Sequence, residues 1–560
     1  MLRTLVLGAS ALTLMACGEG DEAPAVTPAD SVFFGGPIHT GVEALPTVEF
    51  VAVDEGRIVF VGSSEEGAAF VGGETVEIDL AGAAMFPGFT DAHAHLMGIG
   101  QRERSLNLEG VASIAELRAR VAAAAEGTEG VVAGRGWIET HWPEGRFPTR
   151  EDLDAVVPDR PVILVRADGH ALVANSAALE AAGITADTPD PEGGEILKGP
   201  DGEPTGMLVD TAMNPVEALI QAPGPAERAE LLALGSEVMA SYGWTGVHDM
   251  SVDYANVPIM EQLAGEGRLK VRNYVSANAT DYDAVAASLD RYGPADPVIA
   301  RAVKLYADGA LGSRGAALIE PYHDAPGSRG LVLVEEADAL ALMEAALADG
   351  VQLAVHAIGD RGNRLVLDWM EAAFAAVPPE QRAVAEPRWR IEHAQILDPA
   401  DIARFAELGV IASMQPSHAI GDLHFAPDRL GMDRLQGAYA WRALIDEGAV
   451  IAGGSDAPVE RGEARIEFYA ATVRRDLEGY AGEGWHPEQA VGRAEALKMF
   501  TLWPAYASFR EDELGTIALG KLADFSIFDR DLMSVPDDEL ADARPVMTVV
   551  GGEIVWRAEG

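Results

Sequence analysis

The chain has 560 residues, a length that exceeds what a single ordinary core needs. Of these residues, 48% are hydrophobic and 6% are aromatic. We therefore expect one large barrel with an accessory domain, or a few separate domains. Its 41 Lys and Arg residues against 89 Asp and Glu residues give a net charge of −48, which would repel phosphates. Nucleic acid is thus excluded as a partner, and we interpret the acidity as a solvated surface.

The N-terminus has the pattern of an export signal with a lipid attachment site. An apolar run from Leu5 to Ala16 follows one early Arg and is too short to be a permanent membrane helix. The letters LMAC resemble the bacterial lipobox, which implies that Cys17 becomes the lipidated first residue of the mature chain. We expect a signal peptide over 1–17, a tether over 18–30, and an exported protein of the periplasm or cell envelope, held to the membrane only by this anchor. A plain cleaved signal with an incidental cysteine is the alternative.

Alternating segments predict β-strands at both ends of the chain. TVEFVAVDEGRIVFVGS has the pattern of a hairpin, and FSIFDR with PVMTVVGGEIVWRAE repeats it near the C-terminus. Neither end has enough strands to bury a core alone. We expect residues 31–84 and 508–560 to combine in one small β-sandwich, with the rest of the chain inserted between them.

The middle of the chain, over 85–507, alternates short apolar runs with helical stretches, which predicts a parallel sheet covered by helices. Eight such runs occur: MFPGFTDAHAH, TGVHDMS, LKVRNYVSA, RAVKLYADGA, VQLAVHAIGD, RWRIEHAQ, VIASMQPSH and VIAGGSDAP. They predict an α/β fold, a (β/α)8 TIM-like barrel, whose chemistry lies at the carboxyl ends of its strands. The long stretch after the first run, about 100–244, is interpreted as an inserted subdomain that shapes substrate access, or as a structural cap without ligand contacts.

Polar residues recur in these predicted strands and at their ends. His93 and His95 end the first, Lys304 lies in the fourth, His356 ends the fifth, His393 the sixth and Asp456 the eighth. Because the carboxyl ends of barrel strands converge, these side chains predict a metal site at the barrel mouth. A buried lysine loses its proton more readily, and its neutral amine can react with carbon dioxide to give a carbamate that bridges two cations. We therefore interpret Lys304 as a ligand rather than as an ordinary salt-bridged lysine.

Six motifs in this order resemble the amidohydrolase superfamily, in particular its branch of N-substituted formamide deformylases: FPGFTDAHAHL, VKLYADGALGSRGAAL, VHAIGDRGN, RIEHAQ, SMQPSHA and GSDAPVE. The resemblance extends over about 31–560. It implies that His93, His95 and Asp456 bind the more buried of two divalent metals, that His356 and His393 bind the second, and that carbamylated Lys304 bridges them. Zinc is the expected metal, although such ligands also suit manganese and iron. A one-metal site made of His93, His95, one further His and Asp456 is the alternative.

The ligand set predicts a metal-activated hydroxide, with Asp456 as the catalytic group that accepts a proton and passes it to the departing nitrogen. His170, Arg314 and His418 are predicted to contact substrate, with an ion pair as the alternative for Arg314 and a structural role as the alternative for His418. His248 is expected to support the site from below.

These residues predict hydrolysis of a non-peptide C–N bond of an amide, N-formyl or N-acyl type in a small-molecule substrate. The same site acting on an ester, lactone or dipeptide is the first alternative, and a non-catalytic binding lipoprotein is the second. The chain is expected to act alone or as a homo-oligomer.

Overall fold

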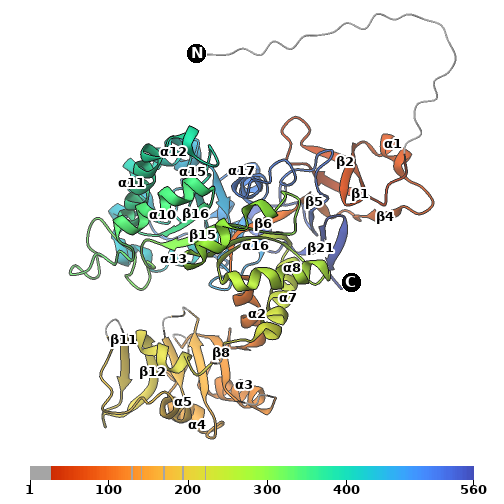
Figure 1. The fold of residues 1–560 in the computed structure, drawn as a ribbon. Coiled ribbons are helices and arrows are strands. Elements are labelled where there is room, and N and C mark those ends of the chain that lie inside the picture. The colour runs from red at the N-terminus through yellow and green to blue at the C-terminus, as the bar shows by residue number, and fades with distance from the viewer. Residues whose placement is uncertain are drawn as a thin grey trace, which may run out of the picture.

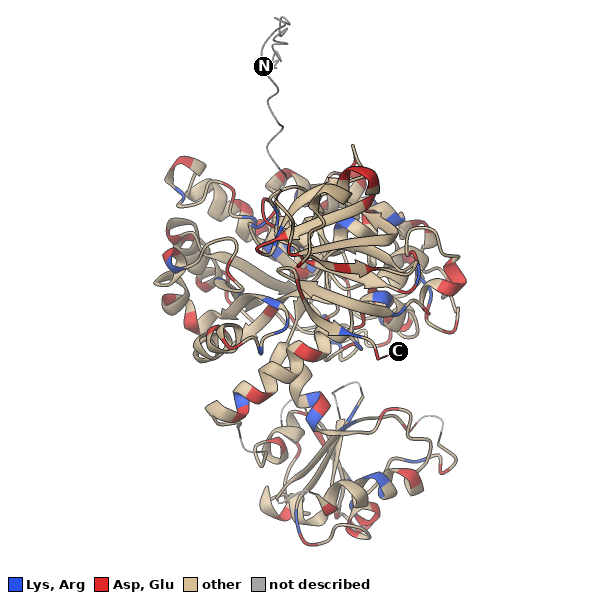
Figure 2. Ribbon diagram, turned by 90° about the vertical axis from the view of Figure 1, so that its right-hand side faces the viewer, with Lys and Arg blue, Asp and Glu red and all other residues tan. Residues whose placement is uncertain are grey.

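The computed structural model describes residues 27–127, 130–139, 142–167, 169, 171–191, 194–220 and 222–559. The predicted signal peptide with Cys17, the first part of the tether and His170 lie outside these residues. Within the described part, no helix combines the length and the apolar character needed to cross a bilayer. Asp and Glu are spread over both lobes seen in Figure 2 rather than gathered in one place, as expected for a solvated acidic surface.

The central body is a barrel of eight parallel strands that follow each other in chain order around the sheet, and all eight apolar runs predicted from the sequence form strands of it. The first and last strands pack beside each other. Most of the strands are buried on both faces, which explains their near-continuous apolar sequence. The strands are β6 (Phe89–Ala94), β13 (Trp244–Val252), β14 (Arg272–Asn278), β15 (Val298–Tyr306), β16 (Gln352–Ala357), β17 (Arg390–His393), β18 (Ile411–Met414) and β19 (Ile451–Gly453).

Helices follow the strands and cover the barrel from outside (Figure 1). α10, for example, ends at Gly350, whose φ of +84° is a left-handed conformation that glycine adopts without strain. The helices are α2 (Leu96–Arg104), α7 (Pro225–Ser241), α8 (Val257–Gly265), α9 (Tyr282–Ala286), α10 (Glu336–Asp349), α11 (Asp360–Ala376), α12 (Ile402–Leu408), α13 (Pro416–Asp422), α14 (Ala426–Leu430), α15 (Trp441–Asp446), α16 (Ala464–Val473), α17 (Arg493–Phe500) and α18 (Leu502–Ala507).

The first apolar run, predicted as one strand, is divided between two sheets at Gly88. Residues before it form β5 (Ala84–Pro87) of the terminal sheet, and residues after it enter the barrel as β6. A Cβ at Gly88 would lie 2.2 Å from Oγ1 of Thr245, so this crossing from one sheet to the other requires a residue without a side chain. The strand prediction was therefore wrong in treating the run as continuous.

Strands from the two chain ends pair in one further sheet of eight strands. β20 (Phe525–Phe528) lies antiparallel to β5, which joins the C-terminal strands to the N-terminal ones. The strand order is continuous, β22-β21-β20-β5-β1-β2-β3 with β4 beside β1, and the two-layered form of the predicted sandwich stays a prediction. The other members are β1 (Ser31–His39), β2 (Thr47–Asp54), β3 (Arg57–Gly62), β4 (Val76–Asp79), β21 (Pro545–Val550) and β22 (Glu553–Arg557), with the short helices α1 (Ser64–Gly67) and α19 (Asp537–Leu540).

The stretch between β6 and β13 carries a separate six-stranded sheet with the order β11-β12-β10-β9-β8-β7. It has its own buried cluster, which includes Leu117, Trp137 and Leu164. Figure 1 shows this inserted subdomain below the barrel, connected through the region of α2 and α7. Its elements are β7 (Leu106–Asn107), α3 (Ile114–Glu126), β8 (Val132–Trp137), α4 (Arg150–Asp154), β9 (Val162–Arg166), β10 (Ala171–Ala174), α5 (Ser176–Ala181), β11 (Gly194–Lys198), β12 (Pro204–Asp210) and α6 (Asn214–Glu217).

Candidate metal centre

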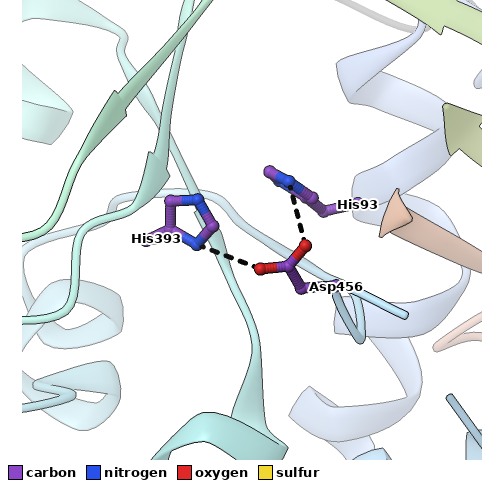
Figure 3. A group of neighbouring side chains, drawn as sticks. All are labelled: His93, His393 and Asp456. Carbon is purple, nitrogen blue, oxygen red and sulfur yellow. Dashed lines mark ion pairs between the residues drawn. The ribbon is translucent and has the colours of Figure 1, made fainter. Parts of the chain in front are cut away.

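Three side chains converge at the carboxyl end of the barrel, as Figure 3 shows. His93, His393 and Asp456 are buried, and each offers one ligand atom within 4.8 Å of the other two. They come from β6, β17 and the loop after β19, which are far apart in sequence and brought together by the closure of the barrel. Imidazole nitrogen and carboxylate oxygen are ligands of zinc and other first-row metals, so this group is the centre of the candidate site.

His93 is oriented by a buried carboxylate that the sequence analysis did not identify. Its Nδ1 lies 2.5 Å from Oε2 of Glu392, so the Nδ1–H donates there and the Nε2 lone pair faces the cluster. Nε2 lies 3.7 Å from Oδ1 of Asp456 and 3.4 Å from Nζ of Lys304. Burial lowers the pKa of His93 to about 4, so the ring is neutral and able to ligate a cation.

Glu392 is held in turn by Arg390, two residues away on the same strand. The Nε of Arg390 lies 2.7 Å from Oε1 of Glu392, and both side chains are fully buried. Burial alone would raise the pKa of Glu392, but Arg390 and His93 hold it well below its usual range. Arg390 also donates to Nδ1 of His248 at 2.7 Å, so His248 belongs to this supporting network rather than to the cluster. Charged residues at alternate positions of a buried strand, as in RIEH, were the signal for it.

His95 lies beyond the end of β6, as the residue that precedes α2. The sequence analysis placed both histidines at the end of the first strand, and this was wrong for His95 because the strand ends at Ala94. His95 nevertheless reaches the site: its Nε2 lies 3.0 Å from Oδ1 of Asp456, and its ring centre lies 5.6 Å from that of His93. Its Nδ1 lies 3.0 Å from the carbonyl oxygen of Met250 and donates to it, which directs Nε2 into the site.

Asp456 is held by its backbone as well as by its side chain. Its φ of +63° is uncommon for a residue with a side chain, and its N–H donates to the carbonyl oxygen of His93 at 2.6 Å. Asp91 supports this loop, since its two oxygens accept from the N–H and hydroxyl of Ser455 at 2.9 and 2.6 Å. Burial alone would raise the pKa of Asp456, but His93 and the hydrogen bond from His95 hold it well below its ordinary value.

One further imidazole, that of His356, lies against His393 of this group. The rings of His356 and His393 are 4.5 Å apart, and Nδ1 of His393 lies 2.9 Å from Oε1 of Gln415. Burial lowers the pKa of His356 to about 3, so this ring is also neutral. Its buried Nε2 has no hydrogen-bond partner among the described residues and lies 3.5 Å from Oδ1 of Asp308.

Lys304 lies in β15 and is buried. Burial lowers the pKa of its amine to about 8, which leaves a larger neutral fraction near neutral pH than an exposed lysine has. The Nζ atom is 5.0 Å from the centre of the Tyr306 ring, whose edge forms part of the mouth. The structure therefore brings Lys304 beside His93, where the sequence placed it.

The residues predicted to contact substrate have different positions. Nε2 of His418 lies 3.5 Å from Oδ2 of Asp456, and its Nδ1 accepts from Nε2 of Gln395 at 2.9 Å, so His418 borders the cluster. Arg314 lies apart from it, paired at 2.8 Å with Asp324 and with 39% of its side chain exposed. His170 lies outside the described residues. For these residues, substrate contact stays a prediction.

The donor set fits a divalent metal. The neutral imidazoles of His93 and His356 and the ionised carboxylate of Asp456 are groups of the kind that a first-row cation requires of its ligands. The buried Nε2 of His356 has no hydrogen-bond partner among the described residues, which costs free energy that a cation would recover. The residues present therefore fit one or two divalent ions.

Comparison with known proteins agrees with this site. The family model described as "Amidohydrolase family" matches residues 76–556. YtcJ of Bacillus subtilis (strain 168), a protein named as an amidohydrolase, is 34% identical over 94% of this chain and 99% of its own length. An N-substituted formamide deformylase of Arthrobacter pascens is 29% identical over 91% of this chain and 95% of its own.

Among solved structures, an uncharacterized metal-dependent hydrolase from Pyrococcus horikoshii OT3 superimposes with a TM-score of 0.74 and 26% identity, covering 90% of this chain and 99% of that one. Because the family model and these relatives match along most of the chain, it belongs to the amidohydrolase family and is a hydrolase that acts on carbon–nitrogen bonds.

Proposed function

We propose that this protein hydrolyses a non-peptide C–N bond of an N-formyl or N-acyl compound of low molecular weight. The observation that carries the proposal is the meeting of His93, His393 and Asp456 within 4.8 Å at the mouth of a barrel. Similarity to the A. pascens deformylase supports the choice of an amide-type substrate. An ester, a lactone or a dipeptide would need the same site, and the substrate panel below separates them.

Two metal positions are proposed on the residues described above. His93, His95 and Asp456 would hold one cation, His356 and His393 a second, and a carbamate on Lys304 would join them. Zinc is the proposed metal. A divalent cation bound there would supply Lewis acidity toward the scissile carbonyl and would lower the pKa of water.

The chain's own groups orient the reaction. Glu392 and the carbonyl of Met250 fix the tautomers of His93 and His95, so that both Nε2 atoms point toward Asp456. Asp456, ionised in a buried setting, is the proposed acceptor of the proton from the attacking water, and it returns that proton to the departing nitrogen. His418, 3.5 Å from Oδ2 of Asp456, is placed to donate to the oxygen that develops negative charge.

The metal content per chain tests this proposal directly. We expect about two metals per chain in the parent by elemental analysis and a lower content in Lys304→Ala. The content should be unchanged in the control Lys270→Ala, a half-buried lysine whose Nζ donates to the carbonyl of Gly267 at the surface. The metal-loaded parent should hydrolyse N-formyl and N-acyl amines in preference to matched esters and dipeptides. A parent that stays free of metal after reconstitution with zinc or manganese would contradict the mechanism, and hydrolysis restricted to esters would contradict the substrate class.

The export signal and lipid anchor are a separate proposal that rests on the LMAC sequence alone. In a bacterial host, radiolabelled palmitate should be incorporated into the parent and not into Cys17→Ser. Equal labelling of both, or labelling of neither, would leave the N-terminus as an ordinary signal peptide at most.

A further inference from the structure

A cavity of about 230 Å³ opens beside His95, between α2, the end of β13 and the end of β14. We call it the His95 cavity. It shares His95 with the metal centre, and Met250, whose carbonyl orients His95, also lines it. The other lining residues have no role in the mechanism above. A group bound there would therefore extend from the scissile bond away from Asp456 and His393.

A distortion of β13 shapes this cavity. The register of β13 against β14 shifts between Met250 and Val252, and Ser251 between them has a φ of +57°, which is strained for a residue with a side chain. As a result the carbonyl of Met250 accepts from His95, while Oγ of Ser251 lies 2.5 Å from the hydroxyl of Tyr306. The strain is local to the cavity wall, where bulges of this kind commonly orient functional groups.

The apolar part of the wall is adaptable. Thioethers are flexible and polarisable, so a wall containing several of them accommodates groups of different shape. The apolar lining consists of Met97, Leu232, Met250, Val252 and Met260. In another protein a cavity of about 150 Å³ holds benzene, so the His95 cavity has room for one ring or a branched chain of similar size.

The polar part of the wall has no positive charge. The neutral polar residues are Gln101, Ser251, Asn256 and Asn278, the acidic ones are Asp249 and Asp253, and no Lys or Arg belongs to the described lining. The neighbouring Arg228 donates to Asp253 and Asn256 at 3.0 and 3.1 Å, so its charge is already compensated. A carboxylate placed in this cavity would lose water beside the acidic Asp249 without gaining an uncompensated cation from the described lining, which is unfavourable.

We propose that the His95 cavity binds the substituent of the substrate and selects substituents that carry no negative charge. The proposal rests on the function proposed above and makes it narrower: the substrates are amides whose substituent is neutral, of one ring or a short branched chain, and without a carboxylate or phosphate. Asn278 and Gln101 are the proposed specificity-determining residues, since both line the cavity and neither is one of the proposed metal ligands. Asn278 is the register partner of Lys304 on the neighbouring strand, whereas Gln101 lies in α2, outside the barrel strands.

The test uses pairs of N-acyl amines that differ only in a neutral or a carboxylated end of the substituent. For the metal-loaded parent we expect the neutral member to bind more tightly by calorimetry and to have a higher kcat/KM, each by at least about 10-fold. Asn278→Lys should reduce this preference by about 10-fold or reverse it, because the new ammonium would pair with the carboxylate. Gln101→Lys, on the exposed side of α2, should act in the same direction with less risk to folding.

The matched control is Val459→Lys, which adds the same charge at an exposed position of the mouth outside the His95 cavity. It should leave the preference unchanged, and all three variants should retain the parental metal content. Equal affinity of the parent for both members, or an equal shift in all three variants, would overturn the inference. Unequal affinities without turnover of either member would support the cavity and contradict the proposed function instead.

Discussion

The barrel and the inserted subdomain both have sheets, helices and buried cores, and one buried polar side chain in each, His356 and Asn175, has a different kind of environment. In the subdomain, Asn175 is buried and uses its whole side chain: its amide donates to the carbonyls of Val157 and Arg160, and its oxygen accepts from two N–H groups. In the barrel, Nε2 of His356 is buried without such a partner. A satisfied polar group rigidifies a fold, whereas a buried imidazole nitrogen without a partner is suited to a ligand. The lack of a partner does not mark the site alone, because Nε of Arg160 in the subdomain is also buried without one. What distinguishes His356 is its position against His393, which belongs to the cluster with His93 and Asp456.

The largest loss of activity should come from replacing Asp456, which lies close to His93, His95 and His418. Replacing Asp456 by Asn keeps its volume but removes the charge and the proton acceptor, so kcat/KM should fall by about 10²–10⁴-fold. Metal content, measured by elemental analysis, should fall as well. Asp324→Asn, which removes a carboxylate from the ion pair with Arg314, is the control and should keep both values. Parental activity in Asp456→Asn would remove this residue from the mechanism.

The next effect concerns the network beneath the metal centre. Glu392→Gln leaves Arg390 buried without its counter-charge, which should lower the free energy of unfolding by about 3–5 kcal/mol. Loss of the carboxylate behind His93 should also weaken metal binding by about 10–100-fold. Denaturant titration and metal competition measure the two effects. Glu230→Gln, which breaks an exposed pair with Arg268, should change stability by at most about 1 kcal/mol.

Much of this barrel could be predicted from the sequence, and the reason is its regularity. Each apolar run was followed by helical periodicity, and ligand-type residues stood at the run ends, so the eight strands were predicted and are confirmed. The division at Gly88 was missed because one glycine does not show which sheet each flank joins. The role of Glu392 was missed because a charged residue inside a buried strand has no evident function until its ion pair with Arg390 is known. The insertion gave weaker signals, because its polar residues satisfy turns and caps rather than a ligand.

The third prediction is that the core of the barrel and the core of the inserted subdomain unfold independently. Leu164→Ala in the insertion and Leu353→Ala in β16 each remove a fully buried side chain, and each should cost about 2–5 kcal/mol. Leu164→Ala should raise hydrogen exchange within the insertion and leave metal content unchanged, because its cavity lies in a separate core. Leu353→Ala should raise exchange in the barrel strands and lower metal content. Equal loss of metal in both variants would mean that the two regions unfold together.

The smallest expected effect is a difference between the barrel and the insertion in how their stability depends on pH. Glu467 in α16 is buried beside Asp91 and Glu460, and burial raises its pKa well above the ordinary 4.5. Above pH 4.5 the folded state therefore holds a proton that the unfolded state has lost, so stability should fall as pH rises, by at most about 1.4 kcal/mol per pH unit. Glu467→Gln should reduce this slope in the stability of the barrel without removing it, because burial also raises the pKa values of Asp91, Asp308 and Glu460 to about 7.

Asp152 in the insertion should respond in the opposite direction. Burial alone would raise its pKa, but the hydrogen bonds from Arg146 and from the N–H of Thr149 lower it below the ordinary 3.8. Its contribution to stability is thus complete above that pH and is lost as the pH falls through the folded pKa. The protection of amides in the insertion, taken relative to their intrinsic exchange rates at each pH, should consequently fall in acid in the parent and change less with pH in Asp152→Asn. If the stability of the barrel and that of the insertion fell in the same pH direction, the pH dependence of stability would not distinguish the two regions.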